Sequence, residues 1–250
     1  MEMAMGNFKK ICIISFILCI ILNCNFNNTK MEAKEMAQNQ KETHNVFANY
    51  TPAKQFDIKK FNAKSNGNID YQFVDNNGME VYQLLDEEYP SEKVNGYYEK
   101  RKYPNSAYTF VSGYDASGLL THTITRFYDV QFGTIKYYDN SSKVIREDNL
   151  DIPYKFSVDD LIDKMKKEYD IDILNTKLIR NIKRYFEEKI NMVFYEVMIW
   201  DLVIDGIMHI YLINGNTGET LLITNRETEW SRQPKERVVD EYIRKKANGE

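Results

Sequence analysis

The stretch VFYEVMIWDLV at residues 193–203 decides the fold. Successive residues of a strand point to opposite faces of the sheet. Here both faces are apolar, with Phe194, Met198, Trp200 and Leu202 on one and Val193, Tyr195, Val197, Ile199 and Val203 on the other. A strand that is apolar on both faces is typical of a sheet that is covered on both sides. The stretch therefore predicts a central strand between two covering layers.

Three neighbouring segments complete a predicted four-stranded sheet around this stretch. Asp205-Gly206 and the run from Gly215 to Gly218 are turn signals that connect the segments as hairpins. The three segments are Leu178–Phe186, Ile207–Ile213 and Glu219–Thr224.

Two helices are predicted beside this sheet. Ser157 caps a helix from Val158 to about Tyr169, and Asp160 stands at the third position of a pattern that is similar to a capping box. Pro234 opens a C-terminal helix, since proline is tolerated at the first helical position. That helix has an apolar face that we expect to dock on the sheet, formed by Val238, Val239, Tyr242 and Ile243.

Residues 56–149 predict antiparallel hairpins. Their turns are rich in Asp and Asn, and the residue that closes such a turn often takes a positive φ. The turns are Asp75–Gly78, Asp115–Gly118 and Asp139–Ser142, between the strand pairs Tyr71–Val74 and Met79–Leu85, Ala107–Tyr114 and Leu119–Tyr128, and Thr134–Tyr138 and Lys143–Arg146. The fold class is thus α+β: an antiparallel, hairpin-rich sheet, then a helix-plus-four-strand module and a C-terminal helix. Whether the two parts share one continuous sheet stays open.

Two segments resemble known families. The capped helix, the strand at 195–199 and the run YLINGNTGETL at 211–221 resemble a PepSY-type domain, although Asn214-Gly215 replaces the family's Asp and small residue. That resemblance implies an extracytoplasmic helix-plus-sheet module without catalytic residues, often attributed to the inhibition of secreted proteases. The unit GTIKYYD at 133–139 is similar to the hairpins of MORN-like repeat proteins, which implies a scaffold or binding surface.

The N-terminus predicts export. Lys9 and Lys10 precede an apolar run from Ile11 to Leu22, which is shorter than the roughly 20 residues of a spanning helix and is typical of a signal peptide. The run ends at ILNC, residues 21–24, which resembles the lipobox of bacterial lipoproteins, with Asn23 where that pattern has Gly, Ala or Ser. The resemblance implies cleavage before Cys24 and acylation of its thiol. Soluble secretion and an uncleaved anchor are the alternatives.

These features predict five consecutive regions: a signal peptide at 1–23, a flexible tether at 24–54, the hairpin region at 55–150, the PepSY-like region at 151–226 and the C-terminal helix at 227–250. All three cysteines, Cys12, Cys19 and Cys24, lie in or beside the signal peptide. A disulfide framework or a cysteine zinc site in the folded part is therefore excluded.

Catalytic and metal-binding motifs are missing from the sequence. His44, His122 and His209 have no ligand-type neighbour at metal spacing, and no serine elbow or Gly-rich phosphate loop is present. Asp201 interrupts an apolar strand and is expected to mark a strand end, a bulge or a contact with Arg180 or Arg184. We expect no catalytic residue, no metal and no cofactor.

One surface stands out as an interaction candidate. Tyrosines alternate with cations in a predicted loop, and Tyr and Arg are enriched at protein interfaces. The residues are Tyr97, Tyr98, Lys100, Arg101, Lys102 and Tyr103. The net charge of −4 shows no basic footprint for nucleic acid.

The expected function is non-enzymatic binding by a lipoprotein of the bacterial cell envelope, facing the periplasm or the exterior, with a protein or envelope component as its partner. An immunity or protease-inhibitor protein is one alternative. A hydrolase that uses paired carboxylates is another.

Overall fold

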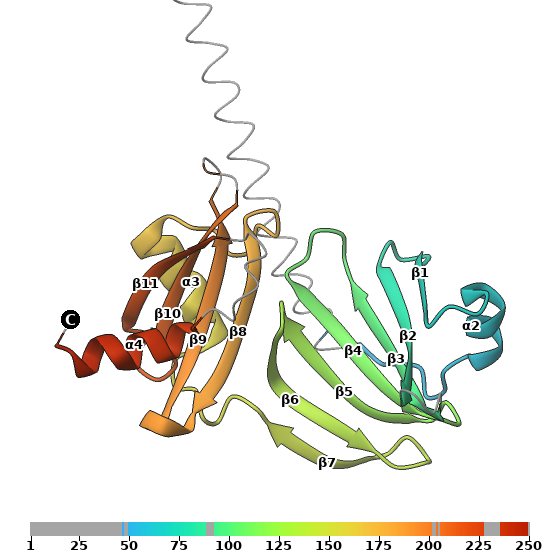
Figure 1. The fold of residues 1–250 in the computed structure, drawn as a ribbon. Coiled ribbons are helices and arrows are strands. Elements are labelled where there is room, and N and C mark those ends of the chain that lie inside the picture. Colours follow the sequence, from blue (N-terminus) through green and yellow to red (C-terminus); the bar gives the residue numbers. More distant parts are fainter. Residues whose placement is uncertain are drawn as a thin grey trace, which may run out of the picture. The chain divides into compact units, whose positions relative to one another are not determined.

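The computed structural model describes residues 47, 50–88, 93–201, 204, 206–227 and 236–249 (Figure 1). The chain forms two compact units, Met1–Asn45 and Val46–Glu250, and all of these residues belong to the second. The predicted signal peptide, Cys24, His44 and most of the predicted tether lie outside the described residues. Among the helices described, none is long and apolar enough to cross a membrane.

The N-terminal part of the second unit is a seven-stranded antiparallel sheet in which each strand pairs with the next along the chain (Figure 1). The three predicted hairpins are confirmed as β1–β2, β4–β5 and β6–β7. The strands are β1 (Asp70–Val74), β2 (Glu80–Glu88), β3 (Lys93–Lys102), β4 (Tyr108–Asp115), β5 (Leu120–Phe127), β6 (Val130–Tyr138) and β7 (Val144–Asn149).

The three hairpin turns share one hydrogen-bonding pattern. The first Asp of each turn accepts backbone N–H bonds from the residues two and four positions later, at 2.8–3.0 Å. The closing residue has a positive φ in each: 78° at Gly78, 84° at Gly118 and 62° at Ser142. Ser142 therefore replaces glycine without changing the turn, because the Asp side chain fixes the loop.

The C-terminal part is a four-stranded antiparallel sheet with two helices. Helix α3 (Val158–Tyr169) has the predicted capping box, in which the Ser157 hydroxyl accepts from the Asp160 N–H and the Asp160 carboxylate accepts from the Ser157 N–H. The other elements are β8 (Ile179–Glu187), the 3₁₀ turn η1 (Glu188–Ile190), β9 (Met192–Trp200), β10 (Ile207–Asn214), β11 (Thr220–Glu227) and α4 (Val238–Ala247).

Strand β9 is covered on both faces, as its sequence predicts. Tyr195, Val197 and Ile199 belong to the apolar cluster that includes α3. Phe194 and Met198 belong to a second cluster with Val238 and Val239 of α4. The predicted docking face of the C-terminal helix is therefore confirmed, but the helix begins at Val238, after its N-cap Arg237, whereas the predicted start, Pro234, lies outside the described residues.

The two sheets are separate, but one core connects them. Tyr108 and Phe127 of the first sheet belong to the same buried cluster as Leu161 of α3 and Tyr195 of β9. Polar contacts reinforce this junction: the Tyr128 hydroxyl donates to the Ile173 carbonyl at 2.9 Å.

Three expectations need correction. Ile58–Ser65 forms helix α2, where only strands were expected from residue 56 onward, because Phe61 is buried against the first sheet. The end of the predicted tether belongs to the fold, since Phe47 is buried and both Phe47 and Tyr50 contact the Phe110 ring.

The third correction concerns the predicted interaction residues at 97–102. They lie in strand β3 and not in a loop. Pairing with β2 and β4 places them inside the seven-stranded sheet.

Candidate binding surface

Because it is a strand, β3 divides the predicted interaction residues between two faces. Successive side chains of a strand alternate, so Tyr97 and Arg101 face one way while Tyr98, Lys100 and Lys102 face the other. Tyr103 follows the strand and packs, half-buried, on the core that joins the two sheets. The structure thus does not bring the six residues together on one surface.

The first group has an internal, structural role. Tyr97 is buried and stacks on Phe56 with ring centroids 4.7 Å apart. Arg101 pairs with Asp75 at 2.7 Å and with Glu99 at 2.6 Å. Glu99 is itself buried and also accepts a 2.7 Å bond from Gln83. These charges are satisfied within the fold, so they do not offer a binding surface.

The second group shares a face with side chains of β2 to β7. Cross-strand pairing aligns Tyr82 with Lys100, Lys100 with Val111, and Tyr98 with Gly113. We call this surface the open face, because none of the three apolar clusters of the described residues includes its side chains. Its members are Tyr82, Tyr98, Lys100, Lys102, Thr109, Val111, His122, Ile124, Arg126, Tyr137 and Arg146.

A row of rings crosses the open face. His122 lies between Tyr98 and Tyr137, with centroid distances of 6.0 and 6.4 Å. The Arg146 guanidinium lies 4.0 Å from the centroid of the Tyr137 ring. Gly113 leaves room for this row, since a Cβ there would lie 2.1 Å from Cε1 of His122. Half-buried tyrosine and histidine rings beside an exposed arginine are typical of recognition surfaces.

Lys100 and Arg126 form the positive centre of the open face. Neither makes a hydrogen bond or an ion pair with any described residue, and the Arg126 Nε is fully buried without a partner. The acids of this face have other partners than these two cations. Asp70 accepts from the Tyr82 hydroxyl, Glu80 pairs with Lys102, and Asp148 pairs with Arg146.

The excess of positive charge also affects the pKa values of Lys100 and His122. Burial, and then the charge of Arg126, lower the pKa of Lys100, and the more distant Asp129 offsets only part of this effect. The same two causes, in the same order, lower the pKa of His122. A lowered lysine or histidine pKa means that the fold disfavours the protonated form, here mainly through burial.

A hollow of about 640 Å³ lies beside this centre. Its polar lining includes Gln72, Tyr82, Thr109, Lys100 and Lys102, all on the open face or its margin. The rest of the lining consists of the apolar residues Phe73, Val74 and Val81 and the acid Glu80, so the hollow combines hydroxyl, amide and ammonium groups with an apolar wall.

The other groups considered from the sequence have structural partners. Asp201 follows the last residue of β9, and its carboxylate contacts His209 Nε2 at 2.9 Å. The expected contact with Arg184 is not formed, because Arg184 pairs with Asp151 at 2.7 Å. Across the described part of the chain, no three His, Cys, Asp or Glu residues are grouped as metal ligands would be.

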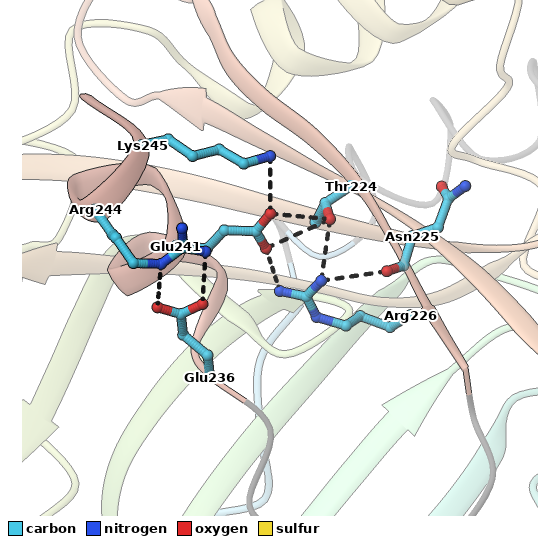
Figure 2. A network of polar contacts seen from close by, with 7 residues as sticks. All are labelled: Thr224, Asn225, Arg226, Glu236, Glu241, Arg244 and Lys245. Carbon is cyan, nitrogen blue, oxygen red and sulfur yellow. Dashed lines mark hydrogen bonds and ion pairs between the residues drawn. The ribbon is translucent and has the colours of Figure 1, made fainter. Parts of the chain in front are cut away.

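A separate polar network holds helix α4 on strand β11. Figure 2 shows Arg226 and Lys245 converging on the Glu241 carboxylate, with Thr224 beside it. Glu241 is buried, and burial alone raises its pKa, but the two cations outweigh that effect and lower it. Arg226, Glu241 and Lys245 thus pair with one another, and their role is to hold α4 on the sheet.

Sequence reasoning identified Tyr98, Lys100 and Lys102 but missed Tyr82, Arg126 and Tyr137. Their proximity depends on the pairing of five different strands, which no local pattern shows. The available signal was alternation within each predicted hairpin, which places Arg126 on the same face of β5 as Ile124. Comparison of the chain with models of protein families, with curated proteins and with solved structures finds no match.

Proposed function

We propose that this chain is a non-enzymatic binding protein of the bacterial cell envelope and that it contacts its partner with the open face. The observation that carries the proposal is the pair of uncompensated cations, Lys100 and Arg126, beside a row of half-buried aromatic rings. Such side chains bury large areas and gain favourable contacts when a partner covers them.

The proposal places the protein at a membrane surface. Support comes from the short apolar run at Ile11–Leu22 and from Cys24 at its end. Stable anchoring takes two acyl chains, since each buried CH₂ contributes about 0.8 kcal/mol and one chain is marginal. The intact mass and detergent partitioning of the wild type and of Cys24→Ala test this placement. Loss of residues 1–23 with a gain of acyl mass only in the wild type supports it, and two soluble proteins of unacylated mass contradict it.

Binding through the open face is tested by co-sedimentation with isolated cell envelopes. Residues 25–250 contain the whole compact unit Val46–Glu250 and lack the proposed lipid site, so sedimentation reports binding by the folded part. Tyr98→Ser combined with Tyr137→Ser should weaken binding at least tenfold. Tyr242→Ser, a matched change on α4, should leave binding unchanged. Equal binding of all three proteins would reject the open face.

Inhibition of a secreted protease or toxin is a second candidate. Helix α3 beside the antiparallel strands β8–β11 is the arrangement that a PepSY-type module implies, and this favours it. The matching test is size-exclusion chromatography with the product of a neighbouring gene, in which a 1:1 complex and loss of that product's activity would support inhibition.

A further inference from the structure

Lys100 of β3 and Arg126 of β5 lie on the same face of the sheet, with strand β4 between them. Lys100 pairs with Val111 and Arg126 pairs with Thr109, and these two β4 residues are separated by two positions. The cations therefore approach each other diagonally across β4. Val111, between them, is only 2% exposed, so the charged groups lie above a dehydrated floor.

This arrangement is costly for the free protein. A half-buried cation loses hydration, and a neighbouring cation adds repulsion instead of compensation. Elsewhere in the described fold, half-buried arginines have acidic partners: Arg101 has Asp75 and Glu99, and Arg184 has Asp151. An external anion would give Lys100 and Arg126 the partner that the described residues do not provide.

The lining of the hollow indicates which kind of anion fits. Here Gln72, Tyr82 and Thr109 offer hydrogen bonds that suit a molecule rich in hydroxyl groups. Tyr82 also presents a ring beside Lys100, whose Nζ lies 5.4 Å from the ring centroid.

We propose that the hollow binds an acidic saccharide, with its carboxylate or phosphate group at the edge of the hollow, between Lys100, which lines it, and Arg126, which pairs with the lining residue Thr109. This inference rests on the proposed function and specifies the ligand class. Arg126 offers a planar group that can bind two oxygens, and Lys100 acts as a compact point charge. Gln72, Thr109 and Lys102 meet the sugar hydroxyls. Lys102 can do so because its 3.4 Å contact with Glu80 is well exposed.

Isothermal titration calorimetry with defined probes tests the inference. Residues 25–250 are titrated with trigalacturonic acid, which carries carboxylates, and with glucose 6-phosphate, which carries a phosphate. Sodium chloride keeps the ionic strength constant, so that screening is the same throughout. Binding of either probe supports the site and identifies the preferred group. Neutral maltotriose should bind at least tenfold more weakly.

Two variants locate the site. Lys100→Gln combined with Arg126→Gln should weaken binding of the acidic probe at least tenfold. Lys136→Gln, which removes a cation from the opposite face of β6, should leave it within twofold. Thermal unfolding provides the folding control, since the double variant should melt no lower than the wild type once two unpaired cations are removed.

The opposing outcomes are distinct. No binding of either acidic probe, or equal binding by the double variant, overturns the anion site. Tighter binding of triaspartate than of trigalacturonic acid overturns the saccharide and indicates an acidic peptide. If the double variant still sediments with envelopes while the Tyr98 and Tyr137 variant does not, the proposed function stands and only this inference fails.

Discussion

The imidazole of His122 occupies the space above Gly113, and this contact positions the ring row of the open face. A Cβ at Gly113 would lie 2.1 Å from the ring. Gly113→Ala should therefore force the ring away and cost about 1–2 kcal/mol of unfolding free energy, as overpacking does. Urea denaturation measures this cost. In a His122→Ala background the same change should be nearly neutral, and an equal cost in both backgrounds would show that the ring does not lie over Gly113.

Lys100 should lower stability in the free protein. Lys100→Met removes a half-buried charge next to Arg126 and should raise the unfolding free energy by up to about 1 kcal/mol. The folded-state pKa of Lys100 lies below its unfolded value. The penalty is therefore complete at neutral pH and disappears as pH rises through the folded pKa toward the unfolded value of about 10.4.

Urea denaturation of the wild type and Lys100→Met at pH 7 and pH 10 checks this prediction. The difference between the two proteins should shrink at the higher pH. A variant that is less stable than the wild type at pH 7 would indicate that Lys100 has an anionic partner within the fold.

Local sequence patterns predicted the roles of some side chains and missed those of others. Ser157 and Asp160 could be identified because a capping box uses positions three residues apart in the chain. Arg126 could not be assigned to the site, because its neighbour Lys100 is far away in sequence. Their proximity across β4 depends on β3, which the sequence does not predict as a strand.

Among the elements, α4 depends on a buried ion pair. Arg226→Met leaves the Glu241 carboxylate, whose side chain is 9% exposed, with Lys245 as its remaining cation. We expect a cost of about 2 kcal/mol, below the range for a fully buried pair that loses one partner. Arg244→Met is the matched control, since its pair with Glu236 is half-exposed and should contribute less than about 1 kcal/mol.

Chemical denaturation across pH tests this assignment. The folded pKa of Glu241 lies below its ordinary value. Its contribution is therefore present above the unfolded pKa of about 4.3 and is lost as pH falls through the folded value. The two proteins should converge in stability in acid. A constant difference down to acid pH would mean that Arg226 acts by packing alone.

Turn chemistry explains why some elements were predictable. Each confirmed hairpin has an Asp that bonds its own turn, a local signal that sequence reveals directly. Strand β3 lacks such a signal and carries many charges, so it resembled a loop. Helix α2 is short, and it is positioned by the burial of Phe61 against distant aromatic rings of the sheet, Tyr97 among them.

Across the second unit, one core includes both sheets, so we expect them to unfold together. Phe127 is fully buried in this shared core and contacts Tyr108 with centroids 5.1 Å apart. Phe127→Ala should cost about 3–5 kcal/mol. Hydrogen exchange should show equal losses of protection in β4–β6 and in β8–β10. Loss confined to the first sheet would show that the two sheets unfold independently.

Apart from α2 and β3, the order of the described helices and strands was predictable, but the arrangement of the sheets was not. The predicted regions at 55–150 and 151–226 contain two groups of strands, and the structure confirms that these groups form two sheets. The junction between them requires Tyr128 to meet Ile173, and Arg184 to meet Leu150, across long sequence separations. No periodicity within a single element predicts such meetings.

Hydroxyl-radical footprinting can show whether the protein contacts the envelope through the open face. Residues 25–250 are labelled alone and with isolated envelopes, and oxidation of individual tyrosines is measured by mass spectrometry. We predict that envelopes protect Tyr82, Tyr98 and Tyr137 while Tyr242 on α4 is labelled equally in both samples. Protection of Tyr242 with unchanged labelling of the three open-face tyrosines would contradict binding through the open face.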